Sequence, residues 1–122
     1  MQSILIVDDQ PYLQELLMEE LMDDGHSVET VTDAISVRRY IRDSKPDLVL
    51  LELYLNGYKG WDVLDDIKSK YPYLPVLIVT AYDNYAEDPR LSKADGYIVK
   101  NFDAIEKLIK MMVELLKREA RE

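Results

Sequence analysis

Short apolar runs alternate along the chain with longer segments in which apolar residues recur at helical spacing. Five of the runs have the length and composition of buried β-strands, and they lie at residues 3–7, 28–31, 47–53, 76–79 and 97–99. After the first run, Leu13, Leu17 and Leu21 follow one another at helical offsets, and Gly25 is placed to end that helix. This alternation predicts parallel βα units and a sheet that is covered by helices on both faces.

The segment between residues 81 and 95 is the exception to this regular alternation. Pro89 lies in its middle, and a proline inside a helix removes one hydrogen bond and clashes with the preceding turn. We therefore expect the fourth of five helices to be shortened or distorted. The fifth helix is predicted from Asp103 onward, where apolar residues again recur at helical offsets.

Composition and charge exclude several classes of protein. A length of 122 residues and a hydrophobic fraction of 48% suit one domain with a substantial core, which we expect to span residues 1–122. The net charge of −9, without a basic patch in the sequence, argues against direct binding of nucleic acid. The chain has no cysteine, and no apolar run approaches the roughly 18 residues that cross a bilayer. We therefore predict a cytoplasmic protein that does not contact the membrane.

Polar residues of the types that act in catalysis and metal binding stand at the ends of four of the predicted strands. Asp8 and Asp9 follow the first strand, Glu52 stands near the end of the third, Thr80 follows the fourth and Lys100 follows the fifth. Ligand sites in open α/β sheets form at the carboxyl ends of the strands, so we expect these side chains to meet at one edge. Three neighbouring carboxylates favour a hard dication such as Mg²⁺, and a hydroxyl and an ammonium suit an oxyanion beside it. The constellation predicts phosphoryl chemistry at a carboxylate.

Four segments resemble the receiver domains of response regulators in two-component signalling. They are IVDD at residues 6–9, PDLVLLEL at 46–53, IVTA at 78–81 and ADGYIVK at 94–100. They occur in the order and at the approximate spacing of that family over essentially the whole chain. The resemblance implies a flavodoxin-like, doubly wound sheet of five parallel strands in the order 2-1-3-4-5, with five helices.

The resemblance also implies roles for single residues in metal binding. Asp8 and Asp9 match the acidic pair that helps to hold Mg²⁺. Glu52 stands at the position of the phospho-acceptor, and the backbone carbonyl of Tyr54 matches a further metal ligand.

Three more positions match the parts of a receiver that respond to a phosphoryl group. Thr80 matches the hydroxyl residue that turns toward it, Tyr97 the aromatic switch, and Lys100 the lysine that contacts its oxygens. The implied partners are a histidine kinase or a downstream signalling protein. The implied output surface is the fourth helix, fifth strand and fifth helix. Extra apolar positions on the last helix, at Met111 and Val113, leave a homodimer open.

Each of these residues also has a simpler structural interpretation. Asp8 and Asp9 are suited to capping the first helix, and Thr80 to ending a strand with an ordinary hydroxyl. Lys100 is suited to a solvated surface, and Tyr97 to plain packing. The agreement of several strand ends favours the functional interpretation.

The main departure from the family is Glu52, because receivers carry an aspartate at the acceptor position. The additional methylene moves the carboxylate about 1.5 Å further out, whereas a reacting centre tolerates errors of only about 0.5 Å. We expect ordinary phosphotransfer to be impaired. Either the longer side chain imitates the active state, or it pairs with Lys100 and locks a scaffold. The second is favoured, because a carboxylate has less charge and fewer acceptors than a phosphoryl group.

Further departures lie at Asn56, Lys59 and Asn101, where the family has other residues. Three functions are compatible with the sequence. The favoured one is a pseudo-receiver that acts through protein contacts, independently of phosphorylation, and is not an enzyme. The second is a conventional receiver that a histidine kinase phosphorylates. The third is a small Mg²⁺-dependent phosphoryl-transfer enzyme with Asp8 as nucleophile, although no glycine-rich phosphate cradle accompanies it.

Overall fold

The computed structural model describes most of the sheet and of the two helices on one of its faces. The described residues are 3–8, 15, 18–19, 21–23, 25–55, 58–80, 87–99, 106–107, 110–112 and 114–115, with residues 54, 55, 58 and 59 described by their backbone alone.

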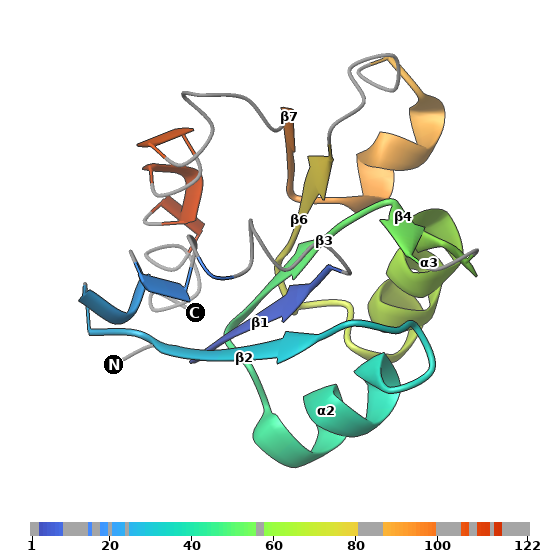
Figure 1. Cartoon of the computed structure of the whole chain (residues 1–122). Coiled ribbons are helices and arrows are strands. Elements are labelled where there is room, and N and C mark those ends of the chain that lie inside the picture. The colour runs from blue at the N-terminus through green and yellow to red at the C-terminus, as the bar shows by residue number, and fades with distance from the viewer. Residues whose placement is uncertain are drawn as a thin grey trace.

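Five parallel strands form one sheet in the order β2-β1-β3-β6-β7 (Figure 1). Their bounds are β1 (Ser3–Val7), β2 (Ser27–Val31), β3 (Leu48–Leu51), β6 (Val76–Thr80) and β7 (Gly96–Val99). Counted along the chain among these five, the order is 2-1-3-4-5, which confirms the predicted fold class. The order reverses between β1 and β3, since β1 pairs with both β2 and β3.

The segment after β3 differs from the prediction. The strand was expected to continue to residue 53, but β3 ends at Leu51. The chain instead turns into a short antiparallel ribbon of β4 (Tyr54–Leu55) and β5 (Tyr58–Lys59). The periodicity failed here because Leu53 is apolar and buried and therefore extends the strand pattern, although it no longer belongs to the sheet.

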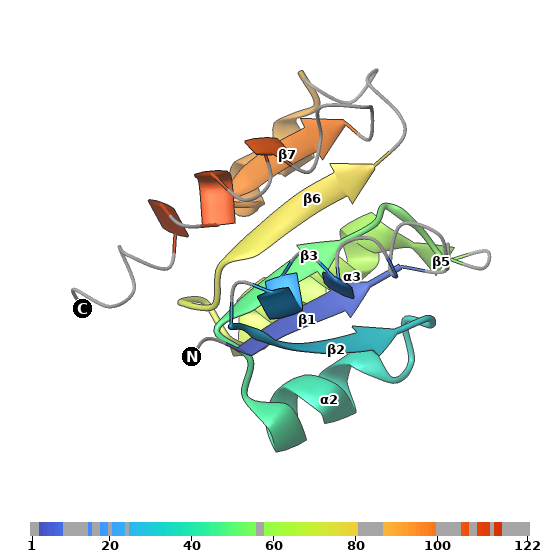
Figure 2. The ribbon, with the colours of Figure 1, turned by 60° about the vertical axis from the view of Figure 1, so that its left-hand side comes forward.

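Side chains of the strands alternate between two apolar cores. Leu5, Val7 and Leu51 point to the face that is covered by α2 (Val37–Ser44) and α3 (Gly60–Lys70). Ile4, Ile6 and Leu50 point to the opposite face, with Leu21, Met112 and Leu115 from the first and last helical segments. Two views show these layers on either side of the sheet (Figures 1 and 2). Because successive residues of a strand face opposite sides, continuous apolar runs such as Leu48–Leu51 supply both cores at once.

The described residues of the first and last segments, 15, 18–19, 21–23, 106–107, 110–112 and 114–115, are helical. Between β6 and β7 the chain forms a 3₁₀ helix, η1 (Pro89–Lys93), as the position of Pro89 favoured. The Asp88 side chain caps it by accepting from the Arg90 N–H. The Arg90 guanidinium and, to a smaller extent, that N–H lower the pKa of Asp88 to about 2. The rest of the predicted fourth helix, residues 81–86, lies outside the described residues.

Within the described part of the chain, every helix is too short or too polar to cross a membrane.

Candidate functional site

Asp8 and Glu52 extend two neighbouring strands of the sheet by one residue each. Val7 is the register partner of Leu51. The Glu52 N–H donates to the Val7 carbonyl at 2.9 Å, and the Asp8 N–H donates to the Val31 carbonyl at 3.0 Å. The backbone of both residues is therefore fixed by sheet hydrogen bonds. Since adjacent strands lie about 4.8 Å apart, the register places the two acidic residues side by side at the carboxyl edge.

Both acidic residues are almost completely removed from solvent, with 3% of each exposed. A buried carboxylate loses its hydration, and a second one nearby adds repulsion of like charges. The arrangement therefore favours a positive charge in this niche, either an ammonium or a metal ion. Asp9 and Lys100, which were predicted to supply a third carboxylate and that ammonium, lie outside the described residues. In the described part, no three His, Cys, Asp or Glu side chains gather into a potential metal site.

The carboxylate of Glu52 is bound to the backbone of its own segment. Its Oε2 atom accepts a hydrogen bond from the N–H of Leu53 at 2.6 Å. Hydrogen bonds to an ionised carboxylate are shorter and stronger than those between neutral groups. One oxygen of the side chain is thus held back against the start of the β4–β5 ribbon.

Gly60 brings the first turn of α3 against the same backbone. Its N–H donates to the Leu53 carbonyl at 2.5 Å. A Cβ atom at this position would lie 2.5 Å from the Glu52 carbonyl oxygen and 2.6 Å from the Leu53 Cα. Only glycine permits this approach. This role of Gly60 was not predicted from the sequence. The available signal was a glycine at the first position of an amphipathic helix.

Thr80 and Tyr97 lie on neighbouring strands and face the same side of the sheet. Ile78 pairs with Tyr97, and Thr80 pairs with Val99, so Tyr97 is offset from Thr80 by one two-residue step. Thr80 is completely buried, and Tyr97 is half-buried against the core on the side of α2 and α3. The geometry suits a hydroxyl and an aromatic ring that move together, which stays a prediction. Tyr54, the predicted source of a carbonyl ligand, begins β4 two residues after Glu52.

Side-chain contacts connect α3 to η1. The guanidinium of Arg90 lies 4.3 Å from the centre of the Trp61 ring, and Lys93 forms a 2.6 Å ion pair with Asp65. Trp61 follows Gly60 directly and is the only tryptophan in the chain. Its fluorescence therefore provides a single-site probe close to both the acidic niche and η1.

Comparison with known proteins identifies the chain. The sequence pattern of the family described as response regulator receiver domain matches residues 4–113. The chain belongs to this family. The resemblance seen in the four segments is thereby confirmed, and the protein is a receiver domain of two-component signalling.

Several curated regulatory proteins are similar in sequence to this receiver domain. The probable transcriptional regulatory protein TcrX of Mycobacterium tuberculosis is 35% identical over 120 residues, which cover 95% of this chain and 50% of TcrX. The chain spans about half the length of the curated relatives it matches.

Among solved structures, the response regulator TrrA of Thermotoga maritima in complex with Mg²⁺-BeF has a TM-score of 0.88 at 32% identity, covering 94% of this chain and 99% of that one. TrrA in complex with the histidine kinase ThkA has a TM-score of 0.81 at 34% identity, covering 95% of this chain and 99% of that one.

Proposed function

We propose that this receiver domain acts as a single module over residues 1–122, through protein contacts and independently of phosphorylation. In this proposal Glu52 occupies the acceptor position, and the chain is a signalling partner without a catalytic turnover of its own. The position of Glu52 directly after β3, beside Asp8 at the carboxyl edge of the sheet, supports this assignment. Two of the curated relatives are named as transcriptional regulatory proteins. The proposal concerns the receiver domain alone and does not extend to an effector domain.

The hydrogen bond between the Glu52 carboxylate and the Leu53 N–H carries the proposal. A nucleophilic carboxylate must approach phosphorus in line with the leaving oxygen, while its own lone pair is free to form the new bond. In Glu52 the side chain is buried, one oxygen is engaged by the backbone, and the chain is one methylene longer than aspartate. This arrangement favours the locked scaffold over imitation of an active state.

The residues at this edge fit a magnesium ion, because they offer hard oxygen ligands of the kind that Mg²⁺ prefers. Asp8 and Glu52 would hold it, with Asp9 and the Tyr54 carbonyl as further ligands. The bound ion would neutralise the buried carboxylates. In the alternative, a conventional receiver, the ion would also orient the oxygens of a phosphoryl group, Thr80 and Lys100 would contact those oxygens, and Tyr97 would follow Thr80. The Mg²⁺-BeF in the related TrrA structure supports this expectation.

A histidine kinase is the proposed upstream partner, which the complex of TrrA with ThkA supports. The proposed downstream surface consists of η1, β7 and the last helix, and the same surface is the proposed site of a homodimer. The described apolar residue Met111 lies half-buried on that last helix.

Intact-mass measurement after incubation with acetyl phosphate and Mg²⁺ tests the proposal. We expect the mass of the 122-residue chain to stay unmodified, because Glu52 cannot reach the in-line position. A stoichiometric phosphoryl adduct that maps to Glu52 would contradict the proposal. It would establish the alternative, a conventional receiver, which membership of the family favours. Hydrolysis of a generic phosphate ester by the wild type, lost in Asp8→Asn, would instead support a small phosphoryl-transfer enzyme with Asp8 as nucleophile.

Magnesium is expected to raise the melting temperature of the wild-type chain. A ligand at about ten times its Kd stabilises a protein by about 1.4 kcal/mol, which corresponds to a shift of several degrees in a domain of this size. Asp8→Asn should abolish the shift, because it removes a charged ligand from the niche. Glu114→Gln, on the exposed surface of the last helix, is the matched control and should retain it. If the wild type shows no shift, magnesium plays no part in this niche.

A further inference from the structure

A groove lies at the end of the sheet opposite the acidic niche. It is formed where α2 and α3 end, and it has a volume of about 350 Å³. Pro46 and Leu74, which line it, precede β3 and β6 in the chain. Glu52 and Thr80 follow the same two strands. Because the strands are parallel, the groove and the niche lie at opposite edges.

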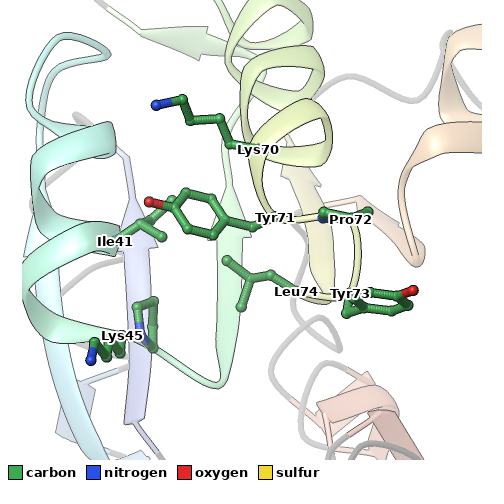
Figure 3. A pocket seen from close by; sticks show the side chains of 8 residues that line it. Ile41, Lys45, Lys70, Tyr71, Pro72, Tyr73 and Leu74 are labelled. Atoms are coloured by element: carbon green, nitrogen blue, oxygen red, sulfur yellow. The ribbon is translucent and has the colours of Figure 1, made fainter.

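The floor of the groove is apolar, and its rim is aromatic and cationic (Figure 3). Ile41 and Leu74 are buried in the floor. The ring of Tyr71 lies between the two helices and points toward Ile41. On the rim, Tyr73 is 83% exposed, and Lys45 stands at the other side. An exposed tyrosine beside a buried apolar floor is typical of surfaces that receive a side chain from a partner.

Among the described residues, neither of two ammonium groups at the groove forms a close ion pair, although the charge of Lys70 helps to lower the pKa of Asp66. Lys45 follows α2 and Lys70 ends α3, and both side chains are exposed. The neighbouring acids on these helices are already engaged, since Asp43 pairs with Arg42 at 2.9 Å and Asp66 pairs with Arg38. In a chain with a net charge of −9, this end of the molecule therefore has a local positive charge.

The backbone of Lys45 gives a second, independent observation. Its φ of 47° and ψ of 63° lie in the left-handed region, where its N–H closes α2 by donating to the Ile41 carbonyl. Glycine is the usual residue at such a position, since any side chain there is strained. It is the only described residue other than glycine with a positive φ. A strained residue that keeps a charged side chain at a groove points to a use for that side chain.

We propose that this groove binds an acidic segment of a protein partner. One apolar side chain of the segment would enter between Ile41 and Leu74, and flanking carboxylates would reach Lys45 and Lys70. The exposed rim leaves the groove open, whereas small molecules are usually enclosed over most of their surface. Two ammonium groups are too few for the phosphate contacts that nucleic acid requires. The site does not depend on Glu52 and would operate with or without phosphorylation.

Nuclear magnetic resonance titration with short peptides tests this proposal on the uniformly ¹⁵N-labelled chain. The probe is the acetylated, amidated peptide EDLDE, with QNLNQ as the neutral version and EDSDE as the version without the apolar side chain. We expect EDLDE to shift the amide signals of Lys45 and of residues 70–74, and both altered peptides to bind several-fold more weakly. Exposed charge pairs typically change affinity up to about fivefold each, so Lys45→Glu with Lys70→Glu should weaken binding at least about tenfold.

Two further variants separate binding from folding. Lys45→Gly removes the ammonium and relieves the strain of the left-handed backbone, so it should raise the melting temperature. The same variant should weaken the binding of the EDLDE peptide about threefold, because one charge pair is lost. Lys110→Glu reverses an exposed charge on the last helix and should change the affinity less than twofold. Shifts elsewhere in the chain, or equal weakening by Lys110→Glu, would overturn the proposal. So would equal binding of EDSDE, or of free indole-3-acetate as a small aromatic acid.

Discussion

Gly60→Ala is expected to lower the free energy of unfolding by about 2–3 kcal/mol, the upper part of the range for overpacking a closed site. The new methyl group would lie 2.5 Å from the Glu52 carbonyl oxygen and 2.6 Å from the Leu53 Cα. Both are backbone atoms, and the Glu52 N–H is held by the sheet. Relief therefore requires α3 to move away from the niche as a unit. Chemical denaturation, followed by the fluorescence of Trp61, measures the loss.

Gly96→Ala is the matched control for this prediction. A Cβ at Gly96 would also meet close neighbours, but these are the side-chain ends of Leu77 and Met111. Flexible side chains can shift, so we expect a cost of about 1 kcal/mol or less. If Gly60→Ala costs no more than Gly96→Ala, the start of α3 is not locked to the Glu52–Leu53 backbone. The position of the niche would then depend on the sheet alone.

Glu52→Asp is expected to make the chain a substrate for acetyl phosphate, with a labelling rate on the order of 100-fold above the wild type. A misplacement of about 1 Å in a reacting group typically costs a factor of this size, and the shorter side chain withdraws the carboxylate by one methylene. In the labelled product, a carboxylate oxygen of residue 52 forms a bond to phosphorus, and acetate leaves with the bridging oxygen. Intact mass over time, with Mg²⁺ present, gives the rate.

Glu52→Gln is the control for this gain of function, because it keeps the length of the side chain and removes the nucleophile. It should stay unlabelled. If Glu52→Asp also stays unlabelled, the lost aspartate is not the main obstacle. Other departures from the family, such as Lys59 in the segment after β3, would then be responsible. The receiver would still be independent of phosphorylation, but the reason would be these other departures and not the lost aspartate.

The direct sequence signals were strongest where one residue and its near neighbours decide the structure. The runs at residues 4–7 and 76–79 are apolar at every position, which is the pattern of strands buried on both faces. The prediction of a distorted fourth helix rested on Pro89, whose ring fixes the backbone wherever it stands. The end-of-strand rule then placed Asp8, Glu52 and Thr80 at one edge. Once the strands are known to be parallel, this follows without any knowledge of packing.

The tertiary structure alone decided where separate elements approach one another. The end of β3 at Leu51, the closeness of Gly60 to Glu52, and the groove between Lys45 and Lys70 are not visible in any local pattern. Strand and helix propensities depend on neighbours in the sequence, whereas these features depend on the angle and distance at which distant elements pack. A glycine at the start of a helix looks the same in the sequence whether its missing side chain would face solvent or a carbonyl oxygen. Only the folded chain distinguishes the two.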